Sequence, residues 1–141
     1  MQFQQINGTD PEKVFIIVKN GYSTGAFSAG NAVAWDYTTA ADGITCTQPT
    51  TALLALPAGI VKTASIAYGD YGLVQVYGHC TTAYVDGSSG TAIGSGLVMQ
   101  NGSYQLIIGT AITPCGVQWA VCGQAHSTGA AAAKKVFLRC M

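Results

Sequence analysis

The fold is decided by the stretch Ile66-Ala-Tyr-Gly-Asp-Tyr-Gly-Leu-Val-Gln-Val-Tyr-Gly-His-Cys-Thr-Thr-Ala-Tyr-Val-Asp-Gly87, in the middle of the chain. Within it, residues 73–85 are rich in β-branched and aromatic residues, so they favour a long strand over a helix. Turn signals bound this strand, with Gly69-Asp-Tyr-Gly72 before it and Asp86-Gly87 after it. Gly78 predicts a bulge, or a point where another backbone comes close.

Side chains alternate across a strand, so residues 73–85 have two faces. One face carries Val74, Val76, Gly78, Cys80, Thr82 and Tyr84. The other face carries Leu73, Gln75, Tyr77, His79, Thr81, Ala83 and Val85. We expect the first face to point into the core.

The composition indicates a single domain with little charge. The 141 residues are enough to bury a core without cross-links. We expect an extended N-terminal arm over residues 1–12, ending at Asp10-Pro11, and one folded domain over residues 13–141. Charged residues make up 9% of the chain, and six acidic residues balance six basic ones. Ordinary soluble proteins carry about 25% charged residues, and low net charge favours association, so the chain is expected to pack against other subunits.

Charge and hydropathy argue against two classes of partner. No basic excess is present to neutralise phosphates, so we expect no nucleic-acid partner. No apolar segment reaches the roughly 20 residues that span a bilayer, so we expect no membrane association. The first residues, Met-Gln-Phe-Gln-Gln-Ile-Asn-Gly, lack a basic segment followed by an apolar run, and no signal peptide is expected.

The reactive residue types are not spaced as in a catalytic or metal site. The five cysteines are Cys46, Cys80, Cys115, Cys122 and Cys140. An odd number without a secretion signal predicts free, mostly buried thiols. His79 and Cys80 are strand neighbours that point to opposite faces, so a Cys–His dyad would need His126 and a distant cysteine. Cys115 and Cys122 are separated by six residues, where zinc sites use two to four. We expect no catalytic residue, no metal ligand and no cofactor.

Short strands separated by glycine turns are predicted along the rest of the chain. They are residues 14–18, 31–36, 44–48, 58–62, 91–99, 104–108, 117–121 and 136–140. Asn101-Gly102 predicts a hairpin turn, and Asp42-Gly43 turns one strand back toward another. Residues 53–56 are expected to form one helical turn, and residues 127–133 a bend or short helical turn. Strands at intervals of about 8 to 15 residues describe an all-β fold, as a small β-barrel or β-sandwich.

Some of these segments suggest where a partner binds. Residues 14–18 are a continuous apolar run, which predicts a strand buried on both sides or covered by a neighbouring subunit. Arms and loops can reach a neighbour without giving up their own pairing. The candidate contacts are Phe3 and Ile6 in the arm, Tyr22 and Phe27 exposed on the glycine-rich loop at residues 20–30, and Tyr71 at the start of the central strand. Asp42, Asp70 and Asp86 stand beside glycines and are expected to be turn residues.

Five segments carry a resemblance to a known family. They are Gly30-Asn-Ala-Val-Ala-Trp-Asp36, Asp42-Gly43, Ala58-Gly-Ile-Val61, Gly69-Asp-Tyr-Gly-Leu-Val-Gln-Val-Tyr-Gly78 and Val136-Phe-Leu-Arg139. Over residues 30–140 the chain resembles the small capsid decoration, or cement, proteins of tailed bacteriophages. The resemblance implies a compact β-unit on the outside of an icosahedral head, where it bridges subunits of the major capsid protein. It also implies self-association, with a trimer favoured and a dimer possible.

The same resemblance implies a protein made in the host cytoplasm and located on the capsid exterior of the virion. A cement works by burying apolar area between subunits, at roughly 25 cal/mol per Å², and needs no titrating group or cofactor. We therefore expect a structural protein that is not an enzyme. The alternatives are another virion β-module, such as a head fibre, tail-tube or receptor-binding component, and an enzyme that uses a Cys–His pair or a carboxylate.

Overall fold

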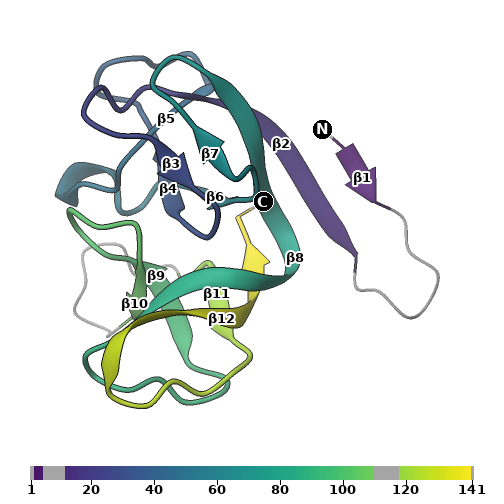
Figure 1. Ribbon diagram of the computed structural model, residues 1–141, viewed down its shortest axis with the longest axis vertical. Coiled ribbons are helices and arrows are strands. Elements are labelled where there is room, and N and C mark those ends of the chain that lie inside the picture. Colours follow the sequence, from purple (N-terminus) through teal and green to yellow (C-terminus); the bar gives the residue numbers. More distant parts are fainter. Residues whose placement is uncertain (1, 5–11, 110–117, 141) are drawn as a thin grey trace.

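A computed structural model of the chain describes residues 2–4, 12–109 and 118–140, and it is built from β-strands (Figure 1). The strands are β1 (Gln2–Gln4), β2 (Lys13–Asn20), β3 (Phe27–Ser28), β4 (Ala32–Trp35), β5 (Thr45–Thr47), β6 (Pro57–Val61), β7 (Ser65–Ile66), β8 (Tyr71–Gly87), β9 (Gly96–Met99), β10 (Leu106–Ile108), β11 (Ala120–Cys122) and β12 (Gly129–Arg139). A 3₁₀ turn, η1 (Thr51–Leu53), lies between β5 and β6. The predicted all-β, single-domain fold is confirmed.

The predicted central strand is β8, and two closed rings of strands share it. Its first half pairs with β2 and β6, and its second half pairs with β10 and β12. The pairings that leave β8 through β2, β5 and β4 return to it through β6, and those that leave through β10, β9 and β11 return through β12. The molecule therefore consists of two small barrels, and Figure 1 shows β8 running from the upper barrel into the lower one.

Gly78 lies where β8 passes from one barrel to the other. It pairs with Lys13 of β2 on one edge and with Leu138 of β12 on the other. Its φ is +92°, and a Cβ at this position would overlap the carbonyl oxygen of Glu12. The prediction of a close backbone approach at Gly78 is confirmed, because only a residue without a side chain fits between these neighbours.

The alternation of faces reverses within the second half of β8. Val136 pairs with Cys80 and Lys134 pairs with Ala83, so three steps along β8 oppose two along β12. One extra residue in a strand moves the following side chains to the opposite face. The predicted inward face is correct for Val74, Val76, Gly78 and Cys80 and wrong for Thr82 and Tyr84, whose neighbours Ala83 and Val85 are buried instead.

Each barrel has its own hydrophobic core. The first core consists of Val14, Val18, Phe27, Val33, Cys46, Ala58, Val61, Ile66, Val74 and Val76. The second consists of Cys80, Ala83, Val85, Leu97, Met99, Leu106, Trp119, Ala120, Cys122, Val136 and Leu138, together with Ala32, Ala34, Leu53 and Ile60. In β4, Val33 belongs to the first core, whereas its neighbours Ala32 and Ala34 belong to the second. β4 is therefore buried on both faces, and the two barrels pack against each other through it.

Local turn signals predicted several connections correctly. β9 and β10 pair as an antiparallel hairpin around Asn101-Gly102. β4 pairs antiparallel with β5 on either side of the predicted turn at Asp42-Gly43. The bend or helical turn predicted at residues 127–133 is confirmed as a bend at residue 128 and is wrong from residue 129 on, because the alanines there belong to β12 and pair with β8 at Val85 and Tyr84. Alanine has a low strand propensity, but pairing with a long neighbouring strand outweighs it.

β2 is buried on one face only, and it pairs with a strand from the N-terminal arm. Val14 and Val18 are buried, but Ile17 is exposed, so burial of residues 14–18 on both sides is wrong within this chain. Coverage of that strand by a neighbouring subunit stays a prediction.

In the arm, residues 2–4 form β1, which pairs antiparallel with β2 and places Phe3 opposite Val14. Ile6 and Asp10 lie outside the described residues.

We expect Gly78→Ala to destabilise the protein more than an alanine at a comparable but open glycine. Gly94 is the matched control, because its φ is +86° and an added Cβ would meet nothing within 4 Å. Gly94→Ala should lower the free energy of unfolding by about 1–2 kcal/mol, the cost of a left-handed backbone for an L-residue. Gly78→Ala should cost at least about 2 kcal/mol more, because the overlap with Glu12 adds to that cost. Urea denaturation measures both values, and equal losses would contradict the close approach.

Candidate interaction surface

The end of β2 and the start of β8 lie at the top of the view in Figure 1. Large apolar side chains in and beside these two strand ends are exposed. Their exposed fractions are 59% for Ile17, 47% for Ile44, 62% for Tyr68 and 61% for Tyr71. We call these four residues the barrel-end patch. Single exposed apolar residues are common on protein surfaces, but several at one end of a barrel indicate a contact surface.

Strand pairing brings two members of the patch together. Ile17 pairs with Leu73 and Lys19 pairs with Tyr71, so Ile17 and Tyr71 are diagonal neighbours on one face of β2 and β8. Leu73 is half-buried between them and extends the apolar face. The backbone N–H of Lys19 donates to the carbonyl of Ile44 at 3.0 Å, which places the third member beside the same strand end.

Asn20 organises the loops beside the patch, and its role was not predicted from the sequence. The residue is fully buried, and its side-chain amide donates to the carbonyls of Gly25 at 3.0 Å and Ile66 at 2.9 Å. Its Oδ1 accepts from the N–H of Tyr22 at 2.8 Å, and its carbonyl accepts from the N–H of Gly69, next to Tyr68. The available signal was an asparagine followed by a glycine at a strand end, a frequent side-chain-stabilised turn.

The loop at residues 20–30 does not expose both of its aromatic residues. Phe27 is fully buried in the first core, so the expectation that it is exposed for a partner is wrong. Its ring lies 5.9 Å from that of Tyr104, and the half-buried ring of Tyr22 lies 6.1 Å from Tyr104 in an edge-to-face arrangement. The loop thus folds back onto the β9–β10 hairpin, which stabilises the first barrel. Of the three candidate contacts whose burial the structure describes, Tyr22, Phe27 and Tyr71, only Tyr71 is exposed.

Acidic side chains beside glycines act in turns. Both carboxylate oxygens of Asp42 accept hydrogen bonds, Oδ1 from the N–H groups of Ile44 at 2.9 Å and Thr45 at 2.7 Å, and Oδ2 from the Thr45 hydroxyl at 2.7 Å. These bonds lower the pKa of Asp42 to about 2, with the backbone bond from Thr45 as the largest cause. Asp86 accepts from the N–H of Ser88 in the same manner. The turn roles predicted for Asp42 and Asp86 are confirmed.

The described thiols are unpaired and mostly buried, as predicted. Cys46, Cys80 and Cys122 are buried and Cys140 is half-buried, while Cys115 lies outside the described residues. Burial raises the pKa of Cys46 far above its usual value, and the nearby carboxylates add to this effect, so its thiol stays protonated. His126 is buried, and its Nε2 forms a hydrogen bond of 3.1 Å with the carbonyl oxygen of Ala130 in β12.

The described parts of the chain contain neither a metal-binding cluster nor a helix that could span a membrane. Across residues 12–109 and 118–140, no group of three His, Cys, Asp or Glu side chains is placed to hold a metal ion. None of the described helical segments has the length and hydropathy that crossing a membrane requires.

Comparison with known proteins gives a likeness in structure. The chain is similar to the N base of the head fibre protein gp8.5 of bacteriophage phi29, with a TM-score of 0.50 and 13% sequence identity. The match covers 89% of this chain and 93% of the gp8.5 chain. At this identity it shows a shared fold. Neither a family model nor a curated protein matches the sequence.

We expect the stabilising effect of Asp42 to disappear in acid. The pKa of Asp42 is about 2 in the folded protein against 3.8 for the unperturbed group. Its contribution to stability is therefore fully present above the unfolded value and is lost as the pH falls through the folded value. Asp42→Ala should lower the melting temperature near neutral pH, and the difference from the unmodified protein should shrink between about pH 4 and pH 2.

Melting curves followed by circular dichroism across this pH range measure the effect. Asp42→Asn is the control, because it keeps an oxygen acceptor for the turn but carries no charge: its deficit should be smaller than that of Asp42→Ala at every pH and should shrink by the same amount in acid. A deficit of Asp42→Ala that is the same at pH 2 and pH 7 would show that the charged hydrogen bonds do not stabilise the turn.

Proposed function

We propose that this chain is a structural protein of a phage virion, attached to the outside of the head. The observation that carries the proposal is the likeness to the base of a phage head fibre over nearly the whole of both chains. Coverage of 89% of this chain requires both barrels to match, because neither barrel alone contains so much of the sequence. The likeness therefore concerns the two-barrel arrangement and not one common motif. The shared fold supports this role by analogy, and binding to phage heads tests it.

Two roles on the head are supported by different observations. The sequence resembles decoration proteins, which favours a cement that bridges subunits of the major capsid protein. The structural neighbour is the base of a head fibre, which favours a module that holds a fibre to the shell. Both roles require adhesion to the capsid exterior, and neither requires chemical turnover, so we propose that the protein is not an enzyme.

The barrel-end patch is the surface that we propose binds the major capsid protein. Ile17 and Tyr71 project from paired strands whose opposite face forms the first core, so their exposure is not needed to close the barrel. Burying one large apolar side chain contributes about 1.5–3 kcal/mol, and several together can offset the cost of association. A chain with a formal net charge of zero has little long-range repulsion to overcome on approaching a shell.

We also propose that copies of the chain associate with one another, with a trimer favoured and a dimer as the alternative. The low charge and the exposed apolar residues support association. Light scattering of the purified protein gives the number of chains directly. A monomer at concentrations of about 100 µM would contradict this part of the proposal without affecting attachment to the head.

We expect substitutions in the barrel-end patch to weaken binding to heads that lack the protein. The test variant is Ile17→Ser with Tyr71→Ser, and binding should weaken by at least about tenfold, since losing 1.4 kcal/mol of contact energy has that effect. Ile93→Ser is the matched control, because Ile93 is 71% exposed but precedes β9 in the second barrel. Cosedimentation with heads measures binding, and circular dichroism checks that each variant folds.

The binding results test the role of the barrel-end patch and attachment to the head as two separate proposals. Normal binding by the double variant would contradict the role of the patch. Failure of the unmodified protein to bind heads would contradict attachment to the head altogether. Electron microscopy of the particle then distinguishes the two roles: a cement contacts several neighbouring capsid subunits, whereas a fibre base carries further density that extends outward from the shell.

A further inference from the structure

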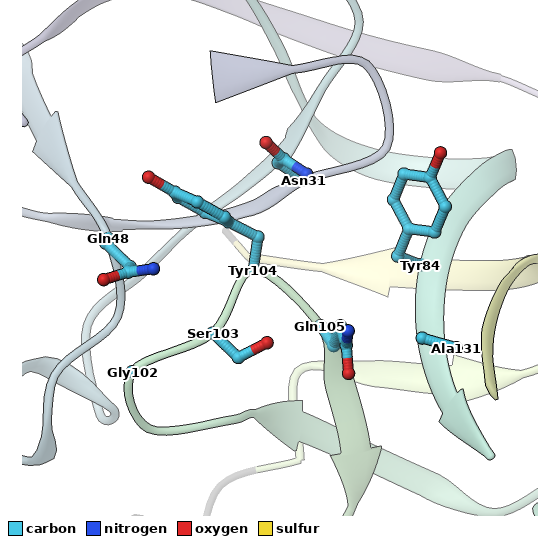
Figure 2. A pocket seen from close by; sticks show the side chains of 8 residues that line it. All are labelled: Asn31, Gln48, Tyr84, Gly102, Ser103, Tyr104, Gln105 and Ala131. Atoms are coloured by element: carbon cyan, nitrogen blue, oxygen red, sulfur yellow. The ribbon is translucent and has the colours of Figure 1, made fainter. Parts of the chain in front are cut away.

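A pocket of about 360 Å³ lies at the seam between the two barrels (Figure 2). It is lined by Asn31 before β4, Gln48 after β5, Tyr84 on β8, and Ser103, Tyr104 and Gln105 in the β9–β10 hairpin. Figure 2 shows Gln48 and Tyr84 on opposite sides, with the other polar side chains between them. The volume falls at the lower end of the roughly 300–1,000 Å³ typical of small-molecule sites.

Backbone hydrogen bonds fix the walls of the pocket. The N–H of Ala32, next to Asn31, donates to the carbonyl of Tyr104 at 2.8 Å. The N–H of Gly102 donates to the carbonyl of Pro49, next to Gln48, at the same distance. These bonds join three segments that are far apart in the sequence. A site whose walls are already joined loses little conformational entropy when a ligand binds.

Tyr84 offers an aromatic surface at one side of the pocket. Its N–H donates to the carbonyl of Gly30 at 3.0 Å, and a Cβ on Gly30 would lie 2.9 Å from Cδ2 and Cε2 of the tyrosine ring. The ring therefore rests against the Gly30 backbone, which holds it in place from one side. It remains 38% exposed. A supported but accessible ring is available for stacking.

The remaining polar side chains of the pocket are uncharged: they are the amides of Asn31, Gln48 and Gln105 and the hydroxyls of Ser103 and Tyr104. Asn31 is oriented by the N–H of Ser28, which donates to its Oδ1 at 2.8 Å, so its Nδ2 is the group left to donate to a ligand. Figure 2 shows this nitrogen on the side toward Tyr84. Gln48, Gln105 and Ser103 add further donors and acceptors. Within the described residues, no charged side chain lines the pocket.

We infer that this pocket binds a neutral saccharide unit, such as a hexopyranose or an N-acetylhexosamine. Sugar hydroxyls both donate and accept hydrogen bonds, and planar amides match them because each amide also does both. The C–H groups on one face of a pyranose ring pack against the electron-rich face of an aromatic ring such as Tyr84. Such binding does not depend on attachment of the chain to a phage head.

Other ligand classes fit the pocket less well. An anion would lack a cationic side chain to offset its desolvation. An apolar ligand would leave the surrounding amides without hydrogen-bond partners. An extended peptide usually gains its affinity by pairing with an open strand edge, whereas β8 beside Tyr84 is already paired with β12 and β10.

The inference is tested on the free protein by NMR titration. The probes are maltose, cellobiose and N,N′-diacetylchitobiose, each at up to about 20 mM, a range that detects millimolar affinity. We expect at least one probe to shift the side-chain amide signals of Asn31, Gln48 and Gln105 in a saturable manner. N-acetylneuraminic acid and a blocked neutral tetrapeptide are the comparison probes and should give no saturable shift at these signals.

Variants of Tyr84 distinguish stacking from nonspecific contact. Tyr84→Phe keeps the ring and should bind within about threefold of the unmodified protein, whereas Tyr84→Ala should bind at least about tenfold more weakly. Tyr68→Ala removes an exposed tyrosine from the barrel-end patch and should have no effect. The inference is overturned if no saccharide gives saturable shifts, if Tyr84→Ala binds normally, or if the tetrapeptide binds and the saccharides do not. Since no capsid is present, none of these results bears on attachment to a head.

Discussion

One strand must complete two barrels, and this constraint explains most of the irregular features of the molecule. β8 gives its first half to one core and its second half to another, so side chains on the same strand must serve two interiors. The change takes place around Gly78, which has Lys13 on one edge and Leu138 on the other. A side chain there would collide with the backbone of the residue before β2, which is why a glycine is required in the middle of the longest strand.

The extra residue between Cys80 and Ala83 follows from the same constraint. An uninterrupted strand would keep Tyr84 on the inward face, where the second core has Ala83 and Val85 instead. The bulge changes the face that points inward, and it also leaves the tyrosine ring at the seam, against Gly30. The exposed ring in the pocket is thus a consequence of how one strand closes two barrels.

The sequence predicted those elements that local chemistry determines. The long strand, the Asn101-Gly102 hairpin and the turn at Asp42 depend on propensity and turn residues, which are visible in a window of a few residues. The reversal after Cys80 depends on how far β12 extends along β8, which no local window contains. The strand formed by the alanines after Gly129 is equally invisible to a local window, since it exists because β8 is available as a partner.

The candidate surface residues also differ in whether local sequence is enough to predict them. Tyr71 could be found from the sequence because Gly69-Asp-Tyr-Gly72 predicts a turn, and turns run over the surface. Phe27 has a similar sequence setting, but the amide of Asn20 fixes its loop at Gly25. Its ring packs against Tyr104, about eighty positions later in the chain, and no local window contains that contact. The seam pocket could not be predicted at all, because its walls come from segments that meet only when both barrels have closed.

The positions of the two surfaces also bear on how they could be used together. Tyr71 begins β8 and belongs to the barrel-end patch, whereas Tyr84 lies near the other end of the same strand and belongs to the seam pocket. A paired strand between barrels packed through β4 is a stiff connection, since bending it would break hydrogen bonds on both edges and disturb both cores. A chain held to a shell through the patch would therefore keep the pocket at a fixed position away from that contact, open to ligands in the surrounding solution.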